Sequence, residues 1–134
     1  MIKLSVHKAS DFDRNVKATI QSTGKLGFSE GAAKKLNLTG DEYFVLASNE
    51  ENNEDENLYG WVERDEDNSG FKVNKSGDYY NINTKPLFDK LQIDYRDKNT
   101  TVIYDIVDFT NGEANIYKLI KRVQKKSTKK LNEE

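Results

Sequence analysis

Six basic side chains are the residues of this chain whose types and spacing could serve a chemical purpose. They are Arg14, Lys17, Lys25, Lys72, Lys75 and Lys85. The first three surround a turn at Gly24, and the others lie at matching places about fifty residues later. Lysine and arginine bind phosphates and release condensed counterions, so a row of them can follow a nucleic-acid backbone. The six residues are candidate contacts to double-stranded DNA, and the alternative is an ordinary solvated strand face.

A second chemical pattern lies in the acidic segment 65–70. Asp65, Asp67 and Ser69 place side-chain oxygens at alternate positions and Gly70 follows, as in the first half of an EF-hand calcium loop. The twelfth position of such a loop would be Ser76 instead of a bidentate glutamate. The flanking residues predict strands instead of helices. We therefore expect no metal site, and these three residues would be the ligands if calcium were bound.

Groups for covalent or acid–base catalysis are sparse. The chain has no cysteine, and His7 is its one histidine, so thiol chemistry and cysteine metal ligands are excluded. No serine stands in a nucleophile elbow, and Gly24 and Gly27 lack the context of a phosphate-binding P-loop. Paired carboxylates occur only in acidic loops that should be solvated. We expect a non-catalytic protein without a cofactor.

The elements that must position the basic residues follow one series, which is strand, strand, helix, strand, strand. Apolar residues alternate before and after the turn at Gly24, where glycine allows a positive φ. Ser29 can cap the following helix by accepting from its free backbone N–H groups. After a second turn at 39–41, the apolar run 43–47 predicts a central strand, and 58–62 predicts its neighbour.

The same series repeats in the second half. Residues 71–77 match 18–24 in pattern, and Asn83 and Pro86 predict the start of a second helix. An apolar strand is expected over 101–109. Asn111 and Gly112 are a strong hairpin signal, so 114–123 should pair back as an edge strand, as 58–63 does in the first half, although its apolar spacing also fits a helix.

These elements predict one mostly β domain over 1–123. Its two ββαβ-type repeats, at about 15–63 and 70–123, bury little core separately, so we expect them to close one shared β-barrel with two short helices. Ile2, Leu4 and Val6 alternate with polar residues and predict an additional N-terminal strand. The basic end 124–134 is expected to be flexible, or else to contact nucleic acid or the acidic loops of a second copy.

Composition agrees with one folded domain. Apolar residues make up 35% and charged residues 33% of the 134 residues, and fourteen aromatic side chains can supply large buried areas. The charge is uneven, with −6 over 1–70 and +4 over 71–134. No apolar run is long enough for a membrane span or resembles a signal segment, so we expect a cytoplasmic protein with no membrane partner.

Residues 24–41 resemble the core of AbrB/MazE-type DNA-binding domains. Their sequence is Gly-Lys-Leu-Gly-Phe-Ser-Glu-Gly-Ala-Ala-Lys-Lys-Leu-Asn-Leu-Thr-Gly-Asp. The family pattern has a turn glycine, alternating strand residues, a helix ending in Leu-x-Leu or Leu-x-Ile, and Gly-Asp before the next strand. Two copies in one chain look like the MraZ arrangement of a swapped-hairpin or cradle-loop barrel. The resemblance implies a transcriptional regulator that contacts DNA through basic residues leading into each helix.

Three positions depart from that family pattern. Ser29 stands where the family usually has proline, and Ala33 and Leu87 stand nearest to the positions of a helical arginine. These departures favour a second hypothesis, a degenerate member of the fold that binds a protein partner and no DNA. The paired lysines at the two turns favour DNA. Both hypotheses remain open from the sequence, as does the oligomeric state.

Overall fold

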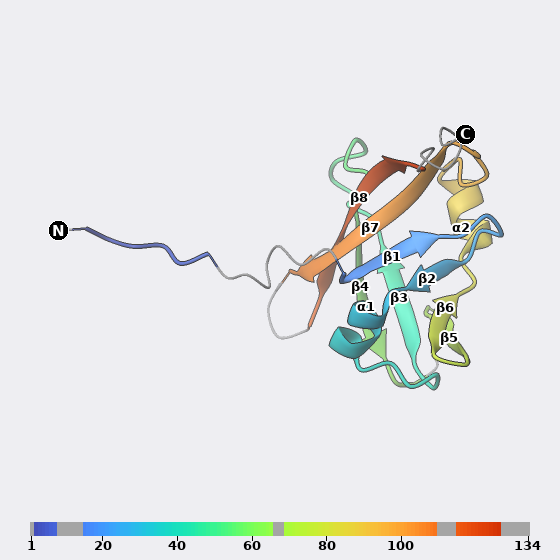
Figure 1. Cartoon of the computed structure of the whole chain (residues 1–134), viewed down its shortest axis with the longest axis horizontal. Coiled ribbons are helices and arrows are strands. Elements are labelled where there is room, and N and C mark those ends of the chain that lie inside the picture. Colours follow the sequence, from blue (N-terminus) through green and yellow to red (C-terminus); the bar gives the residue numbers. More distant parts are fainter. Residues whose placement is uncertain (1, 8–14, 66–68, 110–114, 127–134) are drawn as a thin grey trace, which may run out of the picture.

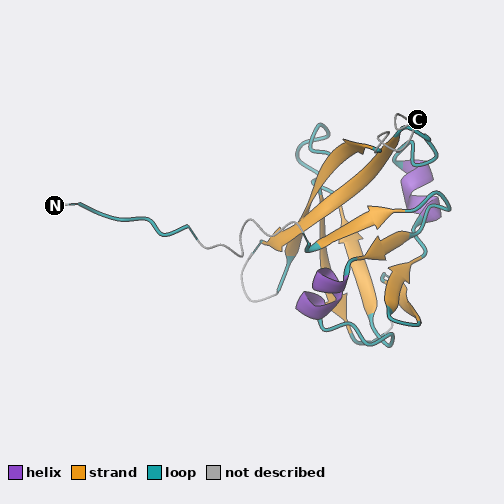
Figure 2. Ribbon diagram, in the orientation of Figure 1, coloured by secondary structure: helices purple, strands orange, loops and turns teal. Residues whose placement is uncertain are grey.

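The computed structural model describes residues 2–7, 15–65, 69–109 and 115–126. Eight antiparallel strands close into a barrel that carries two short helices (Figures 1 and 2), which confirms the predicted fold class. The elements are β1 (Lys17–Ile20), β2 (Leu26–Phe28), α1 (Glu30–Leu36), β3 (Tyr43–Ala47), β4 (Leu58–Glu63), β5 (Phe71–Ser76), β6 (Tyr79–Ile82), α2 (Lys85–Lys90), β7 (Thr100–Asp108) and β8 (Tyr117–Lys125).

The order of the strands around the barrel is β1-β2-β6-β5-β3-β4-β8-β7. The cyclic order is unchanged when β1 to β4 exchange places with β5 to β8. The short β2–β6 pairing, with Gly27 opposite Asn81, joins the first hairpin of one half to the first hairpin of the other. Neither half forms a closed sheet by itself, because every closing contact comes from the other half.

In the first half of the chain, the turns and the helix cap lie where the sequence predicted them. Gly24 and Gly40 have φ of +92° and +101°, a region that other residues rarely adopt. The Ser29 hydroxyl accepts from the backbone N–H of Ala32 at 3.1 Å and also donates to the carbonyl of Asn15, so it caps α1 and ties the helix to the chain before β1. β3 lies between β4 and β5. The prediction of edge strands at 58–63 and 114–123 is wrong, because β4 and β8 pair with each other and the closed barrel has no edge.

The start of α2 differs from the expectation. The N-cap is Thr84, not Asn83, and its side chain makes no capping hydrogen bond. Its hydroxyl instead donates to the carbonyl of Gly24 at 2.9 Å, a contact between residues sixty apart in the sequence. Pro86 in the first turn suits a helix start because its missing N–H would have no helical partner there.

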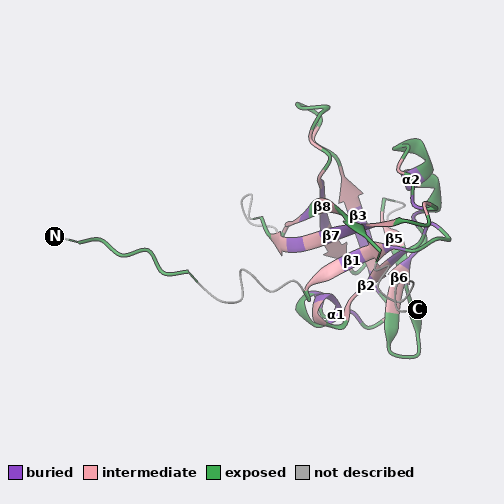
Figure 3. Ribbon diagram, turned by 45° about the horizontal axis from the view of Figure 1, so that its top comes forward, coloured by how far each residue is buried: buried purple, intermediate pink, exposed green. Residues whose placement is uncertain are grey.

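Buried side chains from both halves form one core cluster. Figure 3 shows buried residues in purple along the strands. Phe28 and Phe44 meet edge to face with ring centroids 5.6 Å apart. Phe88 of α2 stacks on Tyr104 of β7 at 6.2 Å. Such aromatic pairs contribute about 0.5–1.5 kcal/mol beyond the area they bury. The aromatic content therefore compensates for the modest apolar fraction of the chain.

The last hairpin resolves the choice between strand and helix. β7 and β8 pair over nine positions, from Thr100 opposite Lys125 to Asp108 opposite Tyr117, which confirms the strand. β8 runs two residues past the expected domain boundary at Val123, so Gln124 and Lys125 belong to the barrel and not to a tail. The backbone N–H of Lys126 also donates to the carbonyl of Asn99.

The predicted N-terminal strand is wrong. Residues 2–7 form no strand and run clear of the barrel (Figure 1). The side chains of Ile2, Leu4 and Val6 are each 82% exposed. Alternation of apolar residues indicates only that a segment can pair, and within this chain the closed barrel leaves the segment without a place in the sheet. Four further predictions lie outside the described residues, namely those for Arg14, Asp67, the turn 111–112 and residues 127–134.

Candidate functional site

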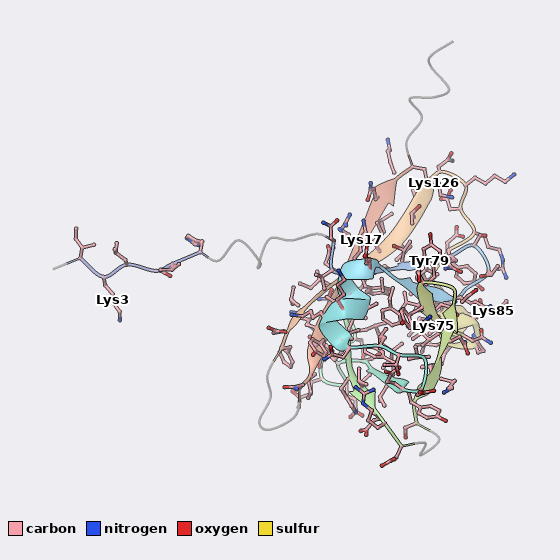
Figure 4. The ribbon with its side chains drawn as sticks, turned by 60° about the horizontal axis from the view of Figure 1, so that its bottom comes forward. Lys3, Lys17, Lys75, Tyr79, Lys85 and Lys126 are labelled. Atoms are coloured by element: carbon pink, nitrogen blue, oxygen red, sulfur yellow. The ribbon has the colours of Figure 1, made fainter. Side chains whose placement is uncertain are left out.

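The five candidate lysines that the structure describes come from both halves of the chain. They lie on or beside four strands that are adjacent in the barrel. We call this part the lysine sheet: strands β1, β2, β6 and β5, the β1–β2 turn and the first residue of α2. Lys17 is in β1, Lys25 in the turn, Lys72 and Lys75 in β5, and Lys85 begins α2. Figure 4 shows three of these lysines, Lys17, Lys75 and Lys85, around Tyr79. Barrel closure thus gathers residues that lie up to 68 positions apart in the sequence.

The outward side of the lysine sheet is polar. Inward positions such as Ala18, Leu26 and Ile82 are buried, whereas the alternate positions are half-buried or exposed. The outward positions include Lys17, Thr19, Gly27, Asn81, Asn74 and Lys72. β1, β2, β5 and β6 contain no aspartate or glutamate, unlike the other four strands taken together. A shallow hollow of about 290 Å³ opens on this face, and Lys17, Thr19, Gly27 and Asn81 are among the residues that line it.

The β1–β2 turn that carries Lys25 packs on the start of α2, next to Lys85. A Cβ atom at Gly24, the neighbour of Lys25, would lie 2.8 Å from the Cβ of Lys85. Glycine at position 24 therefore allows the turn to lie directly against the helix. The Lys85 ammonium also bonds Asp89 at 2.8 Å, and this hydrogen bond raises the pKa of Lys85. Asp89 partly neutralises this end of the lysine sheet.

Lys72 and Lys75 lie at the other end, beside the turn that follows α1. The Lys72 ammonium donates to the carbonyl of Gly40 at 3.1 Å and lies 5.2 Å from the ring centre of Tyr43. Lys75 has the inward parity of Val73 and approaches Gly40, with its ammonium 2.8 Å from the carbonyl of Gly77. Lys75 is exposed, but its side chain does not share the outward face with Lys17 and Lys72.

A buried carboxylate that the sequence analysis missed holds this turn. Glu42 is fully buried and accepts from the backbone N–H groups of Thr39 at 2.6 Å and Gly40 at 3.0 Å, and from Arg64 at 2.8 Å. Burial alone would raise its pKa, but hydrogen bonds from Thr39 and Gly40 outweigh it and lower the pKa to about 2. The Thr-x-x-Glu spacing of Thr39 and Glu42 was the available signal, because it is the spacing of a capping box.

A larger groove borders the lysine sheet. We call it the helix–hairpin groove, because α1 forms one wall and the β5–β6 hairpin the other, and its volume is about 960 Å³. Phe28, Ala33 and Leu38 contribute its apolar surface, and each is less than a tenth exposed. Tyr79 on the hairpin lines the groove and is 75% exposed. A concave surface with a few apolar side chains and an exposed aromatic side chain is a form suited to binding.

Neither helix presents a cation where the resembled family has arginine. Ala33 is buried at 8% exposure and faces the helix–hairpin groove. Leu87 is half-buried and packs against the core. The basic groups of the lysine sheet therefore lie on strands and turns and at the start of α2.

The calcium candidates lie between two strands, as the sequence predicted. Asp65 follows β4, Ser69 precedes β5, and both are exposed. Within the described ranges, no three histidine, cysteine, aspartate or glutamate side chains gather closely enough to hold a metal ion. None of the described helices has the length and apolar content needed to cross a membrane.

Comparison with known proteins adds no relative: no family model, curated protein or solved structure matches this chain.

Proposed function

We propose that this chain is a non-catalytic binding protein, and that the lysine sheet binds the phosphate backbone of double-stranded DNA. The observation that carries this proposal is a set of four adjacent strands that contain no acidic residue and carry Lys17, Lys72 and Lys75. Lys25, in the β1–β2 turn, and Lys85, at the start of α2, lie at the ends of these strands. Phosphate contacts of this type position a protein on DNA without reading its sequence. The resemblance of 24–41 to AbrB/MazE-type domains supports the same ligand, as does the twofold pattern of the strand order.

Fluorescence anisotropy of a labelled random-sequence duplex, titrated with the chain at several salt concentrations, tests this proposal. The variant Lys17→Gln/Lys25→Gln/Lys72→Gln removes three positive charges without adding acidic groups. Its matched control removes three exposed lysines outside the proposed contact positions, as Lys90→Gln/Lys98→Gln/Lys125→Gln. The slope of log K against log salt is negative, and each lost phosphate contact should reduce its magnitude by about 0.9. The magnitude for the first variant should therefore be smaller than that of the wild type by about 3.

Two results would contradict DNA binding by the lysine sheet. One is wild-type protein that shows no salt-dependent retention of the duplex. The other is an equal loss of affinity in the two triple variants, which would mean that only total charge matters.

A second candidate function is protein binding without DNA. It is favoured by the local acceptors of three lysines, which are the carbonyls of Gly40 and Gly77 for Lys72 and Lys75 and the Asp89 carboxylate for Lys85. It is also favoured by the apolar helix–hairpin groove. Absence of duplex binding together with salt-insensitive association with another polypeptide would select this function.

A further inference from the structure

The segment 2–7 presents an apolar edge to solvent. Ile2, Leu4 and Val6 alternate with Lys3, Ser5 and His7, and the three apolar side chains are each 82% exposed. In an extended chain, alternate side chains lie on the same side, so these three form one continuous stripe. Such a stripe is usually covered by another surface, because exposing it to water is unfavourable. Figure 4 shows Lys3 and its neighbours far from the barrel.

The helix–hairpin groove has the dimensions to cover this stripe. An extended segment from Ile2 to Val6 spans about 13 Å, at about 3.3 Å per residue. The seven residues of α1, which form one wall, span about 10 Å. Phe28, Leu38 and Ala33 supply apolar contacts inside the groove, and the small Ala33 side chain leaves room beside the helix.

The charges on the rim suit the polar edge of the same segment. Glu30 on α1 and Asp78 on the hairpin both line the groove and are exposed. Lys34 also lies there and pairs with Glu30 at 3.8 Å, so these three charged side chains on the rim sum to −1. With the apolar stripe turned inward, Lys3 would lie near these carboxylates. A basic, alternating segment thus fits both the chemistry and the shape of the groove.

We propose that the helix–hairpin groove binds residues 2–6 of a second copy of this chain. The segment leaves its own groove open and extends clear of its own barrel, so its apolar stripe is available to another molecule (Figures 1 and 4). Two copies can exchange these segments reciprocally, each filling the groove of the other, which gives a closed twofold dimer. This interaction is independent of whether the lysine sheet binds DNA.

Sedimentation velocity of single variants tests the contact from both sides. Leu4→Asp places a charge on the apolar stripe, whereas Ser5→Asp places the same charge on the polar edge. Because both positions lie outside the barrel, neither change should affect its folding. We expect Leu4→Asp to raise the dimer dissociation constant at least about tenfold, since burying an unpaired carboxylate is costly, and Ser5→Asp to change it less than about threefold.

The groove is tested by Tyr79→Asp, at a side chain that is 75% exposed and carries little of the core. Asn74→Asp, on the same hairpin but outside the groove lining, is its matched control. Tyr79→Asp should weaken the dimer about as much as Leu4→Asp, and Asn74→Asp should leave it intact. Urea unfolding of all four variants, at a concentration well below the dimer dissociation constant of the wild type, should show the wild-type midpoint, which separates loss of the interface from loss of the fold.

A mixing experiment identifies the partner of each surface. The Leu4→Asp chain keeps an intact groove, and the Tyr79→Asp chain keeps an intact segment, so an equimolar mixture should form a heterodimer through one contact. Wild-type protein that stays monomeric up to about 0.5 mM would overturn the proposal, whether its segment is exposed or folded onto its own barrel. A dimer that survives Leu4→Asp would also overturn it.

Discussion

The carboxylate of Glu42 lies 2.8 Å from the guanidinium of Arg64, with the glutamate fully buried and the arginine side chain 59% exposed. This ion pair joins the turn after α1 to the end of β4. Lys72 bonds the carbonyl of Gly40 within that turn, so the pair also supports one edge of the lysine sheet. The buried member matters more for stability, because its hydrogen-bond donors would lose their partner if it were changed.

Replacing Glu42 with glutamine should lower the free energy of unfolding by about 2–3 kcal/mol. The amide keeps the size of the side chain but removes the charge and turns an NH₂ group towards backbone donors. Equilibrium urea unfolding at pH 7 measures the change. Glu30→Gln is the control, because its side chain is 87% exposed and pairs loosely with Lys34, so it should cost less than about 0.5 kcal/mol.

Stability should fall in acid because of the same carboxylate. The pKa of Glu42 is lowered from 4.5 to about 2 in the folded chain, so its contribution is complete above about pH 5 and is lost as the pH falls to about 2. This fall in pKa corresponds to about 3 kcal/mol. Urea titrations from pH 7 to pH 2 should show this loss in the wild type. If Glu42→Gln retained the full slope, other carboxylates such as Asp89 would be responsible.

Gly60 in β4 should tolerate no side chain. A Cβ atom there would lie 2.6 Å from Cε2 of Phe44 and 2.7 Å from the carbonyl oxygen of Val45. Gly60→Ala should therefore destabilise the barrel by about 2 kcal/mol, measured as a lower urea midpoint. Gly77→Asn is the control, because position 77 has φ +63° with open space around it and asparagine tolerates that conformation. Equal losses in the two variants would contradict a steric origin.

Two tyrosines should respond oppositely to removal of the hydroxyl group. Tyr104 is fully buried, and its hydroxyl has no hydrogen-bond partner among the described residues, so Tyr104→Phe should leave stability unchanged or raise it by up to about 1 kcal/mol. The Tyr95 hydroxyl donates to Asp89 at 2.6 Å, so Tyr95→Phe should cost about 1–2 kcal/mol. Thermal and urea unfolding measure both. A similar cost in Tyr104→Phe would indicate a buried water bound to its hydroxyl.

Sequence patterns predicted the local elements well where a single neighbourhood decides the structure. The cap at Ser29, the turn at Gly24 and the proline at the start of α2 all depend on hydrogen bonds or backbone angles within a few residues. The apolar run 43–47 likewise indicated a central strand, because both of its faces had to be covered.

Longer-range packing decided what those patterns left open. The N-cap of α2 is Thr84 instead of Asn83, and its hydroxyl donates to the carbonyl of Gly24, sixty residues away. Residues 2–6 have a good strand pattern but no strand partner in the closed barrel. Glu42 has the sequence context of an ordinary acidic turn residue. Its structural role depends on the donors that Thr39, Gly40 and Arg64 place around its carboxylate.

The sequence by itself indicated both helices, the main turns and most strands, and it gives which side chains are basic, because those properties depend on residue type and short spacing. Only the tertiary structure decided that Lys17, Lys25, Lys72 and Lys85 lie on or beside four adjacent strands, and that Lys75 turns aside toward Gly40. The physical reason is the pairing of β2 with β6, a contact between segments more than fifty residues apart that no local pattern encodes.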